Sequence, residues 1–217
     1  MTHPDASEID QDPAAVLTDK LAIRDLVDQW IIASDSGLWD LFDEVWHEDG
    51  VMAATWFQAS ARDFADARRK GFEAGVSIIH ANLGHISDVR GSRAIAQTKM
   101  TISQRAPVHG VMVDVVATGR FYDFLEKRAG KWGMVRRQPI YEKDRMDPVE
   151  PGATLRLDSK ILDLFPVGYR HLAYLQTQIG YDVKRSGMPG LIGPETDLLY
   201  TQGTAWLNGT GGAGVVG

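Results

Sequence analysis

Four long stretches of β-branched and other apolar residues follow one another through the middle of the chain, and they constrain the fold more than any other feature. The stretches span residues 78–89, 94–105, 111–125 and 132–142. The links at 90–92 and 128–130 are short and contain glycine. Such residues favour extended backbone, and consecutive strands with short links pair antiparallel. The sequence therefore predicts an antiparallel meander at the centre of the fold.

Helical patterns precede this meander. Ile23, Leu26, Trp30 and Ala33 are three, four and three residues apart, which places them on one face of a helix. The expected elements are a helix from about 17 to 36, a second helix at 38–46, a strand at 51–56 and a third helix at 60–75. Helices followed by a sheet predict an α+β fold, with three N-terminal helices packed on one face of the sheet. Asp35 lies at the corner between the first two helices.

The two ends of the chain differ from this central part. Residues 1–15 are polar and contain two prolines, so we expect a flexible arm. Residues 16–147 form the predicted domain, and 148–208 form an irregular extension that proline and glycine break into pieces, with one convincing helix at 170–179. The apolar residues of this extension are expected to pack on the domain or on a neighbouring subunit. Residues 209–217 are rich in glycine and are expected to be disordered.

Charge and cysteine content exclude several classes of protein. The net charge is −6 and Lys and Arg are not clustered, so nucleic acid is not an expected partner. The chain has no cysteine, which excludes a disulfide framework, a thiolate nucleophile and a cysteine-ligated zinc site. The first 12 residues are acidic and polar, and no apolar stretch approaches the length of a membrane span. The sequence therefore predicts a cytoplasmic protein without a membrane partner.

Three stretches resemble one known family. They are Ala22-Ile23-Arg24-Asp25-Leu26 with Trp30, Asp35 and Trp39-Asp40; His80 with Leu83-Gly84, Val89, Gly91 and Ala94; and Gly119-Arg120-Phe121-Tyr122-Asp123 with Lys131-Trp132. In these residues and in element order, the region from 17 to 147 is similar to the SnoaL-like branch of the nuclear-transport-factor-2-like superfamily, which includes scytalone dehydratase, bile-acid dehydratases and dehydrochlorinases. The resemblance implies a cone-shaped barrel in which helices close a curved antiparallel sheet.

The same resemblance implies a catalytic pair. Asp35 matches the aspartate that ends the first helix of these enzymes, and His80 matches their catalytic histidine. The carboxylate would accept from one ring nitrogen and raise the pKa of the imidazole relative to an unpaired ring in the same pocket, while the other nitrogen takes a proton from substrate. Without the resemblance, Asp35 reads as a solvated corner residue and His80 as a core histidine. Trp30 stands where relatives have tyrosine or lysine, so it supplies neither phenol nor ammonium.

Aromatic and polar residues near this pair are candidates for substrate binding. Trp30 and Trp56 belong to an aromatic group in the first half of the chain, part of which we expect to line a cavity suited to a ring-bearing substrate. Asn82 faces the same way as His80 on a regular strand, and His85 joins them only if a bulge intervenes.

Two adjacent arginines on the last strand offer an anchor for a leaving group or an oxyanion. One of them must face the concave side of the sheet, and Arg136 is slightly favoured over Arg137. The alternative is that both arginines are solvated or paired with acidic neighbours. No cofactor is expected, because the chain lacks a glycine-rich phosphate loop. No metal is expected either, because zinc-motif spacing is missing from the candidate ligands His80, His85, His109 and Asp114.

Two functions of different kinds fit this sequence. The first is a cofactor-free lyase or isomerase in which His80 moves a proton of a small-molecule substrate while water, halide or a small carbonyl fragment such as formaldehyde leaves. The alternative is a noncatalytic SnoaL-like protein, either a small-molecule binder or an assembly subunit. Relatives are often dimers or trimers, so we expect a homo-oligomer, with a weak preference for a trimer.

Overall fold

The computed structural model describes residues 12–214. The helices are α1 (Pro13–Ser36), α2 (Trp39–Glu44), α3 (Ala61–Glu73), α4 (Ser159–Leu162), α5 (Arg170–Gln178) and α6 (Pro194–Leu207). The strands are β1 (Trp46–Ala53), β2 (Gln58–Ser60), β3 (Ser77–Arg90), β4 (Arg93–Val108), β5 (Val111–Arg128) and β6 (Lys131–Pro148). The α+β class and the antiparallel meander from β3 to β6 are confirmed.

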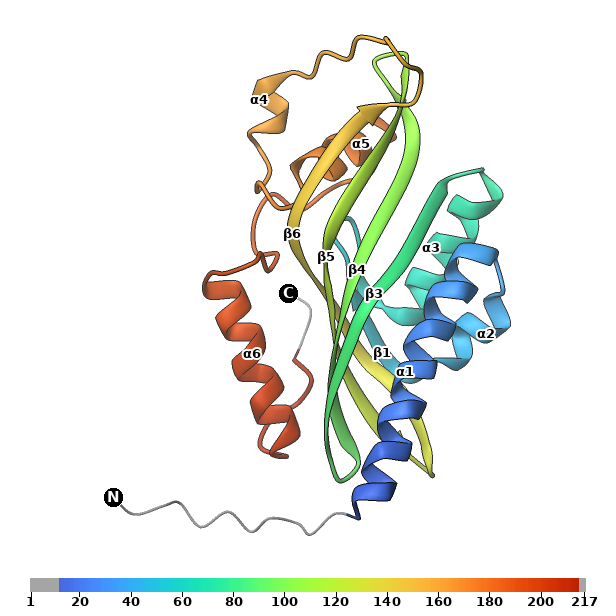
Figure 1. Cartoon of the computed structure of the whole chain (residues 1–217), viewed down its shortest axis with the longest axis vertical. Helices are drawn as coiled ribbons and strands as arrows, with labels where there is room; N and C mark the ends of the chain where they lie inside the picture. The colour runs from blue at the N-terminus through green and yellow to red at the C-terminus, as the bar shows by residue number, and fades with distance from the viewer. Residues whose placement is uncertain (1–11, 215–217) are drawn as a thin grey trace.

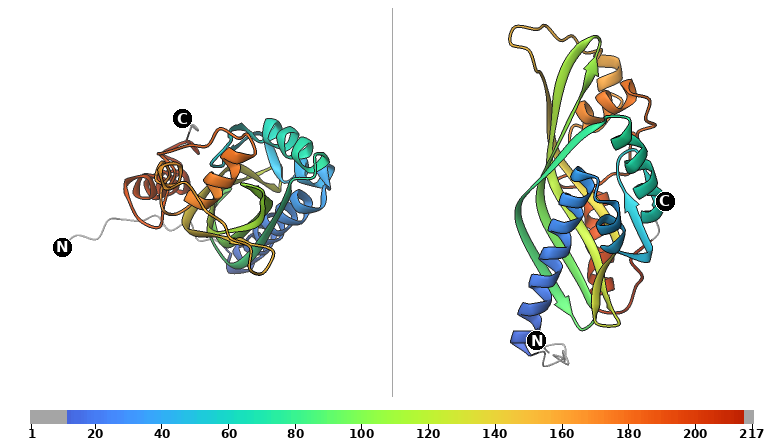
Figure 2. Two further views of the ribbon diagram at one scale, coloured as in Figure 1. Left: turned by 90° about the horizontal axis from the view of Figure 1, so that it is seen from above. Right: turned by 90° about the vertical axis from the view of Figure 1, so that its right-hand side faces the viewer.

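One curved, open sheet carries the whole fold. Its strand order is β2-β1-β6-β5-β4-β3, so β3 is an edge strand and β1 pairs with β6. The β1–β6 pairing is parallel, and β1 begins at Trp46 rather than at residue 51, because a bulge between Trp46 and Val51 takes up the predicted turn. Helices α1, α2 and α3 cover one side of the sheet and α6 lies against the other (Figure 1). Seen from above, the sheet curls and α5 lies near the upper end of the curl (Figure 2).

The first helix starts earlier than the apolar pattern indicates. Asp12 caps it by accepting from the backbone N–H of Ala14, and Pro13 occupies the first turn, where a missing N–H costs nothing. Residues 12–15 are therefore capped helix rather than a flexible arm, while residues 1–11 lie outside the described part. Gly37 ends the helix with φ of 70°, a left-handed conformation that favours glycine. This stop places Asp35 in the last helical turn.

The sheet separates two apolar clusters. The concave side holds the main core, in which α1 contributes Ile23, Val27 and Trp30 and the sheet contributes Met100 and Phe121. The convex side holds a smaller core between the sheet and α6, and its buried residues include Tyr122, Phe124, Ile140, Leu199 and Trp206. Residues 121–125 of β5 and 132–141 of β6 are therefore buried on both faces of the sheet and show no alternation of burial.

The C-terminal extension packs on its own domain and contains a helix that the sequence analysis missed. Pro194, interpreted as a chain breaker, occupies the first turn of α6, where proline is favoured. Residues 209–214, for which composition predicts disorder, return to the sheet: Ala213 is buried, and its carbonyl accepts from Arg136 at 2.9 Å. Residues 215–217 lie outside the described part. The extension therefore covers both sides of its own sheet, with α6 on the convex face and α5 at the concave side.

The contact between α6 and the sheet depends on a glycine. A Cβ atom on Gly203 would lie 1.9 Å from the hydroxyl oxygen of Tyr122. We therefore expect Gly203→Ala to lower the free energy of unfolding by about 1–3 kcal/mol through overpacking, measured by chemical denaturation. Gly71→Ala is the matched control, because Gly71 lies within α3 and the nearest atom to its added Cβ is 3.6 Å away. The control should stabilise the protein slightly. Equal effects of the two substitutions would contradict the close packing of α6.

Candidate active site

Asp35 and His80 are in direct contact. The Nδ1 atom of His80 lies 2.7 Å from Oδ1 of Asp35, and the backbone N–H of His80 donates to Oδ2 at 2.6 Å. Both carboxylate oxygens are therefore bound to a single residue of β3. A carboxylate in the last turn of a helix faces the negative end of the helix dipole, so His80 supplies the compensating contacts. This clamp fixes the position and orientation of the imidazole.

The clamp also defines which nitrogen of the ring is free. An ionised carboxylate only accepts hydrogen bonds, so Nδ1 carries the proton in the neutral ring. No hydrogen bond within residues 12–214 engages Nε2. Burial, the largest effect, lowers the pKa of His80 below its ordinary value of 6.5, while Asp35 acts in the opposite direction, as the sequence analysis expects of that carboxylate. At neutral pH the imidazole is thus a neutral base with an available Nε2.

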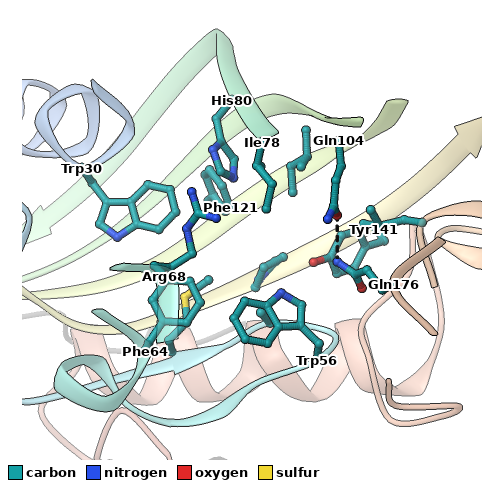
Figure 3. Close-up of a pocket in the computed structure, with 15 residues that line it drawn as sticks. Trp30, Trp56, Phe64, Arg68, Ile78, His80, Gln104, Phe121, Tyr141 and Gln176 are labelled. Atoms are coloured by element: carbon teal, nitrogen blue, oxygen red, sulfur yellow. Dashed lines mark hydrogen bonds between the residues drawn. The ribbon is translucent and has the colours of Figure 1, made fainter. Parts of the chain in front are cut away.

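His80 lines a cavity between the helices and the concave side of the sheet. The space between its walls, up to and including the open mouth, is about 450 Å³. Its walls are mostly apolar and aromatic, and α5 contributes Leu172 and Gln176 to them (Figure 3). The other lining residues are Trp30, Met52, Ala54, Trp56, Phe64, Arg68, Ile78, Ile102, Gln104, Phe121, Pro139 and Tyr141. A cavity of this character suits an apolar molecule with a ring.

Of the predicted substrate-binding residues, the structure brings Trp30 and Trp56 to this cavity. The ring of Trp30 packs edge-on against His80, with ring centroids 5.3 Å apart. Asn82 does not line the cavity and donates to Asp28 on α1. A bulge between Asn82 and Gly84 does intervene, and the ring of His85 hydrogen-bonds to the buried Thr98 at 2.8 Å. His85 is nevertheless separate from the cavity that His80 lines.

The structure contradicts the preference for Arg136 over Arg137 as the arginine on the concave side of the sheet. Arg136 lies on the convex side, where it donates to Gln202 and Ala213 and stacks on Phe124. Arg137 faces the concave side but is fully buried and ion-paired with Asp123, at 2.7 and 2.8 Å. A bulge opposite Phe124 and Leu125 shifts the alternation of β6, and no feature of the sequence reveals it. Neither arginine lines the cavity.

Four polar residues of the cavity were not singled out from the sequence. Gln104, Tyr141 and Gln176 gather at one end, where Gln176 donates to Gln104 at 3.4 Å. Burial raises the pKa of Tyr141, so its hydroxyl stays protonated at neutral pH. Arg68 lies at the other end, beside His80 (Figure 3). The helical spacing of α3 does indicate that Arg68 is buried, because Arg68 lies on the same face as Ala61, Phe64 and Ala65.

A second pair has the same geometry as Asp35 and His80. Asp144 on β6 accepts from the ring Nδ1 of His171 at 2.8 Å and from its backbone N–H at 2.6 Å. It also accepts from the backbone N–H of Leu172, which anchors the first turn of α5 to the sheet. His171 does not line the cavity.

Residues 12–214 contain neither a cluster of metal-ligating side chains nor a membrane-spanning helix. No group of three or more His, Cys, Asp or Glu side chains is arranged to hold a metal ion there. None of the helices in that range is long and apolar enough to cross a membrane.

The curved sheet, the helices on its concave side and the enclosed His–Asp pair define a SnoaL-like α+β cone. The sequence profile of the SnoaL-like domain matches residues 15–138, and the chain belongs to this family. Two similar proteins come from Fusarium vanettenii: a PEP2-like protein and pea pathogenicity protein 2. Each is 33% identical over 96% of this chain and 94% of its own length. A protein of Emericella nidulans is 31% identical with the same coverage.

Solved structures share the fold at low sequence identity. Hexachlorocyclohexane dehydrochlorinase LinA-type3 from Novosphingobium barchaimii superimposes with a TM-score of 0.52 at 13% identity, covering 68% of this chain and 100% of that one. A structure provisionally named as a scytalone dehydratase, from Novosphingobium aromaticivorans, gives a TM-score of 0.54 at 18% identity, covering 66% of this chain and 100% of that one. These similarities establish the cone fold.

Proposed function

We propose that this protein is a lyase or isomerase that acts on an apolar, ring-bearing small molecule, with Asp35 and His80 as its general base. The setting of the imidazole carries the proposal, because a carboxylate fixes one ring nitrogen while the ring lines an aromatic cavity. The dehydratase and dehydrochlorinase names among proteins of the same fold are in keeping with it.

In the proposed elimination, Nε2 of His80 takes a proton from carbon. The electron pair of the broken C–H bond forms a new double bond, and the leaving group departs from the adjacent carbon with its own bonding pair. Halide leaves as the anion, whereas a hydroxyl leaves as water after the imidazolium returns the proton to it. Asp35 stabilises the imidazolium between these steps. An isomerase would use the same base and return the proton to a different carbon.

Deuterium exchange tests this proposal whatever the leaving group is. Cyclic hydroxyketones and haloalkanes are incubated with the protein in D₂O, and both product and deuterium uptake are followed by NMR. We expect at least one compound to react or to exchange, and His80→Gln to abolish both signals. A compound that binds in the cavity with neither product nor exchange would support the noncatalytic alternative, a small-molecule binder.

The lowered pKa of His80 predicts a pH dependence. The base must be neutral, so the acidic limb of kcat/KM should have an apparent pKa below 6.5. Stability should follow the same group: as pH falls below 6.5 the unfolded chain binds the proton first, so the free energy of unfolding decreases until the folded pKa is reached. Denaturation curves of wild type and His80→Gln measure this difference. His85, whose pKa burial also lowers, is unchanged in both proteins and cancels.

A further inference from the structure

Arg68 is a buried cation that the proposed acid–base step does not use. It projects from α3 into the cavity and is 4% exposed. Its Nη2 atom donates to the carbonyl and hydroxyl oxygens of Ser34 at 3.3 and 3.4 Å, which are long contacts with neutral acceptors. Its Nε atom has no hydrogen-bond partner in the described part of the chain. Burying a guanidinium with only these weak contacts costs free energy, because the charge loses its hydration without gaining an ion-pair partner.

The contrast with Arg137 shows what a neutralised arginine looks like in this protein. Arg137 is also buried, and Asp123 holds it through two short hydrogen bonds. No carboxylate among residues 12–214 lies within ion-pair distance of Arg68. Asp35 is near enough to influence Arg68 electrostatically, but both of its oxygens are already bound to His80. Arg68 therefore retains hydrogen-bonding capacity toward the cavity.

Arg68 lies beside the proposed base, His80. Figure 3 shows its guanidinium beside the ring of His80, and both side chains line the same cavity. A proton leaves carbon readily when the electron pair can move onto an adjacent carbonyl oxygen, and a positioned cation stabilises the charge that develops there. A guanidinium suits a planar oxyanion because its N–H groups form a fixed fork.

We propose that Arg68 binds an oxygen that becomes anionic during the reaction, so that the substrates are compounds whose transferred hydrogen lies next to a carbonyl group. This inference rests on the proposed function. The C–H bond breaks, its proton goes to Nε2 of His80, and its electron pair forms a C=C bond. The carbonyl π pair moves to oxygen, giving an enolate that Arg68 holds. When the carbonyl forms again, the enolate expels a leaving group from the next carbon or takes a proton elsewhere.

Binding of 4-nitrophenolate tests the anion site without turnover. The phenolate is a planar, one-ring oxyanion, and 4-nitrotoluene is a neutral molecule of nearly the same shape. We expect the wild type to bind the phenolate about tenfold more tightly or better, as charge-assisted hydrogen bonds provide. Arg68→Gln should remove this preference while leaving nitrotoluene affinity unchanged. Arg69→Gln, one residue further on α3 but partly exposed and paired with Asp66, should retain it.

Each outcome decides the inference. A wild type with no preference for the phenolate overturns it, whether or not Arg68→Gln folds. Equal weakening of both ligands in Arg68→Gln also overturns it, because that result indicates a packing role. Arg68→Lys keeps a charge and should show a reduced preference with unchanged nitrotoluene binding. His80→Gln should still bind the phenolate more tightly than nitrotoluene. Failure of the proposed base would instead be seen as unchanged turnover in His80→Gln, so the two failures are distinguishable.

Discussion

Replacing His80 by glutamine is expected to lower kcat/KM for any substrate of this protein by about 10²- to 10⁴-fold, the usual contribution of a positioned general base. Glutamine preserves the approximate size of the side chain and a donor toward Asp35, but it has no basic nitrogen. Asp35→Asn should also lower kcat/KM, because the amide cannot stabilise the imidazolium and leaves the tautomer unfixed. Both rates are measured on protein whose fold is verified by circular dichroism.

His171→Gln is the matched control for this experiment. It removes the same kind of ring from the same kind of carboxylate clamp, in a residue that does not line the cavity. Turnover in this variant should remain close to that of the wild type. Equal losses in His80→Gln and His171→Gln would mean that the clamps act through folding alone, and unchanged turnover in His80→Gln would eliminate the proposed base.

The largest effect on stability is expected at the ion pair between Arg137 and Asp123. Both side chains have no exposed surface, and Arg137 also stacks on Trp30 and Phe121 at 4.3 and 4.1 Å. Arg137→Met leaves the Asp123 carboxylate buried without its partner, which costs about 3–5 kcal/mol in comparable cases. The free energy of unfolding from urea denaturation measures the loss.

Two further variants show whether charge or packing is responsible. The double variant Arg137→Met with Asp123→Leu replaces the pair by apolar groups, so it should recover much of the lost stability. Arg105→Met provides the exposed comparison, since Arg105 forms a similar two-pronged pair with Asp114 across β4 and β5. Its effect should be much smaller because water solvates both partners. A double variant as unstable as Arg137→Met would attribute the loss to the aromatic contacts.

The elements that sequence reasoning finds here are those whose residue pattern is local. The meander follows from extended stretches with glycine-containing links, and α1 follows from its apolar stripe. The pattern predicts too late a start for β1 because its bulge looks like a turn, and its parallel partner β6 is remote in sequence. Helix α6 is not predicted from the sequence because Pro194 reads as a breaker, although it occupies the first turn of the helix.

The same distinction applies to the candidate site. Only the family resemblance predicts the contact between Asp35 and His80, since the residues are 45 positions apart and no local pattern joins them. The face on which an arginine of β6 lies depends on a bulge, so the sequence left the choice between Arg136 and Arg137 nearly open. Arg68 is not among the predicted site residues, because a charged residue on an amphipathic helix is usually solvated and only its place on the apolar stripe indicates otherwise.

The presence of two carboxylate clamps on histidine affects how such proteins should be surveyed. A search that ranks histidine–aspartate pairs by interatomic distance would return Asp144–His171 beside Asp35–His80, with separations of 2.8 and 2.7 Å. The first pair anchors a helix to the sheet, and only in the second does the histidine ring line the apolar cavity. A geometric template for annotating genomes should therefore score the surroundings of the histidine Nε2 atom. The contact between Nδ1 and the carboxylate identifies structural pairs as readily as catalytic ones.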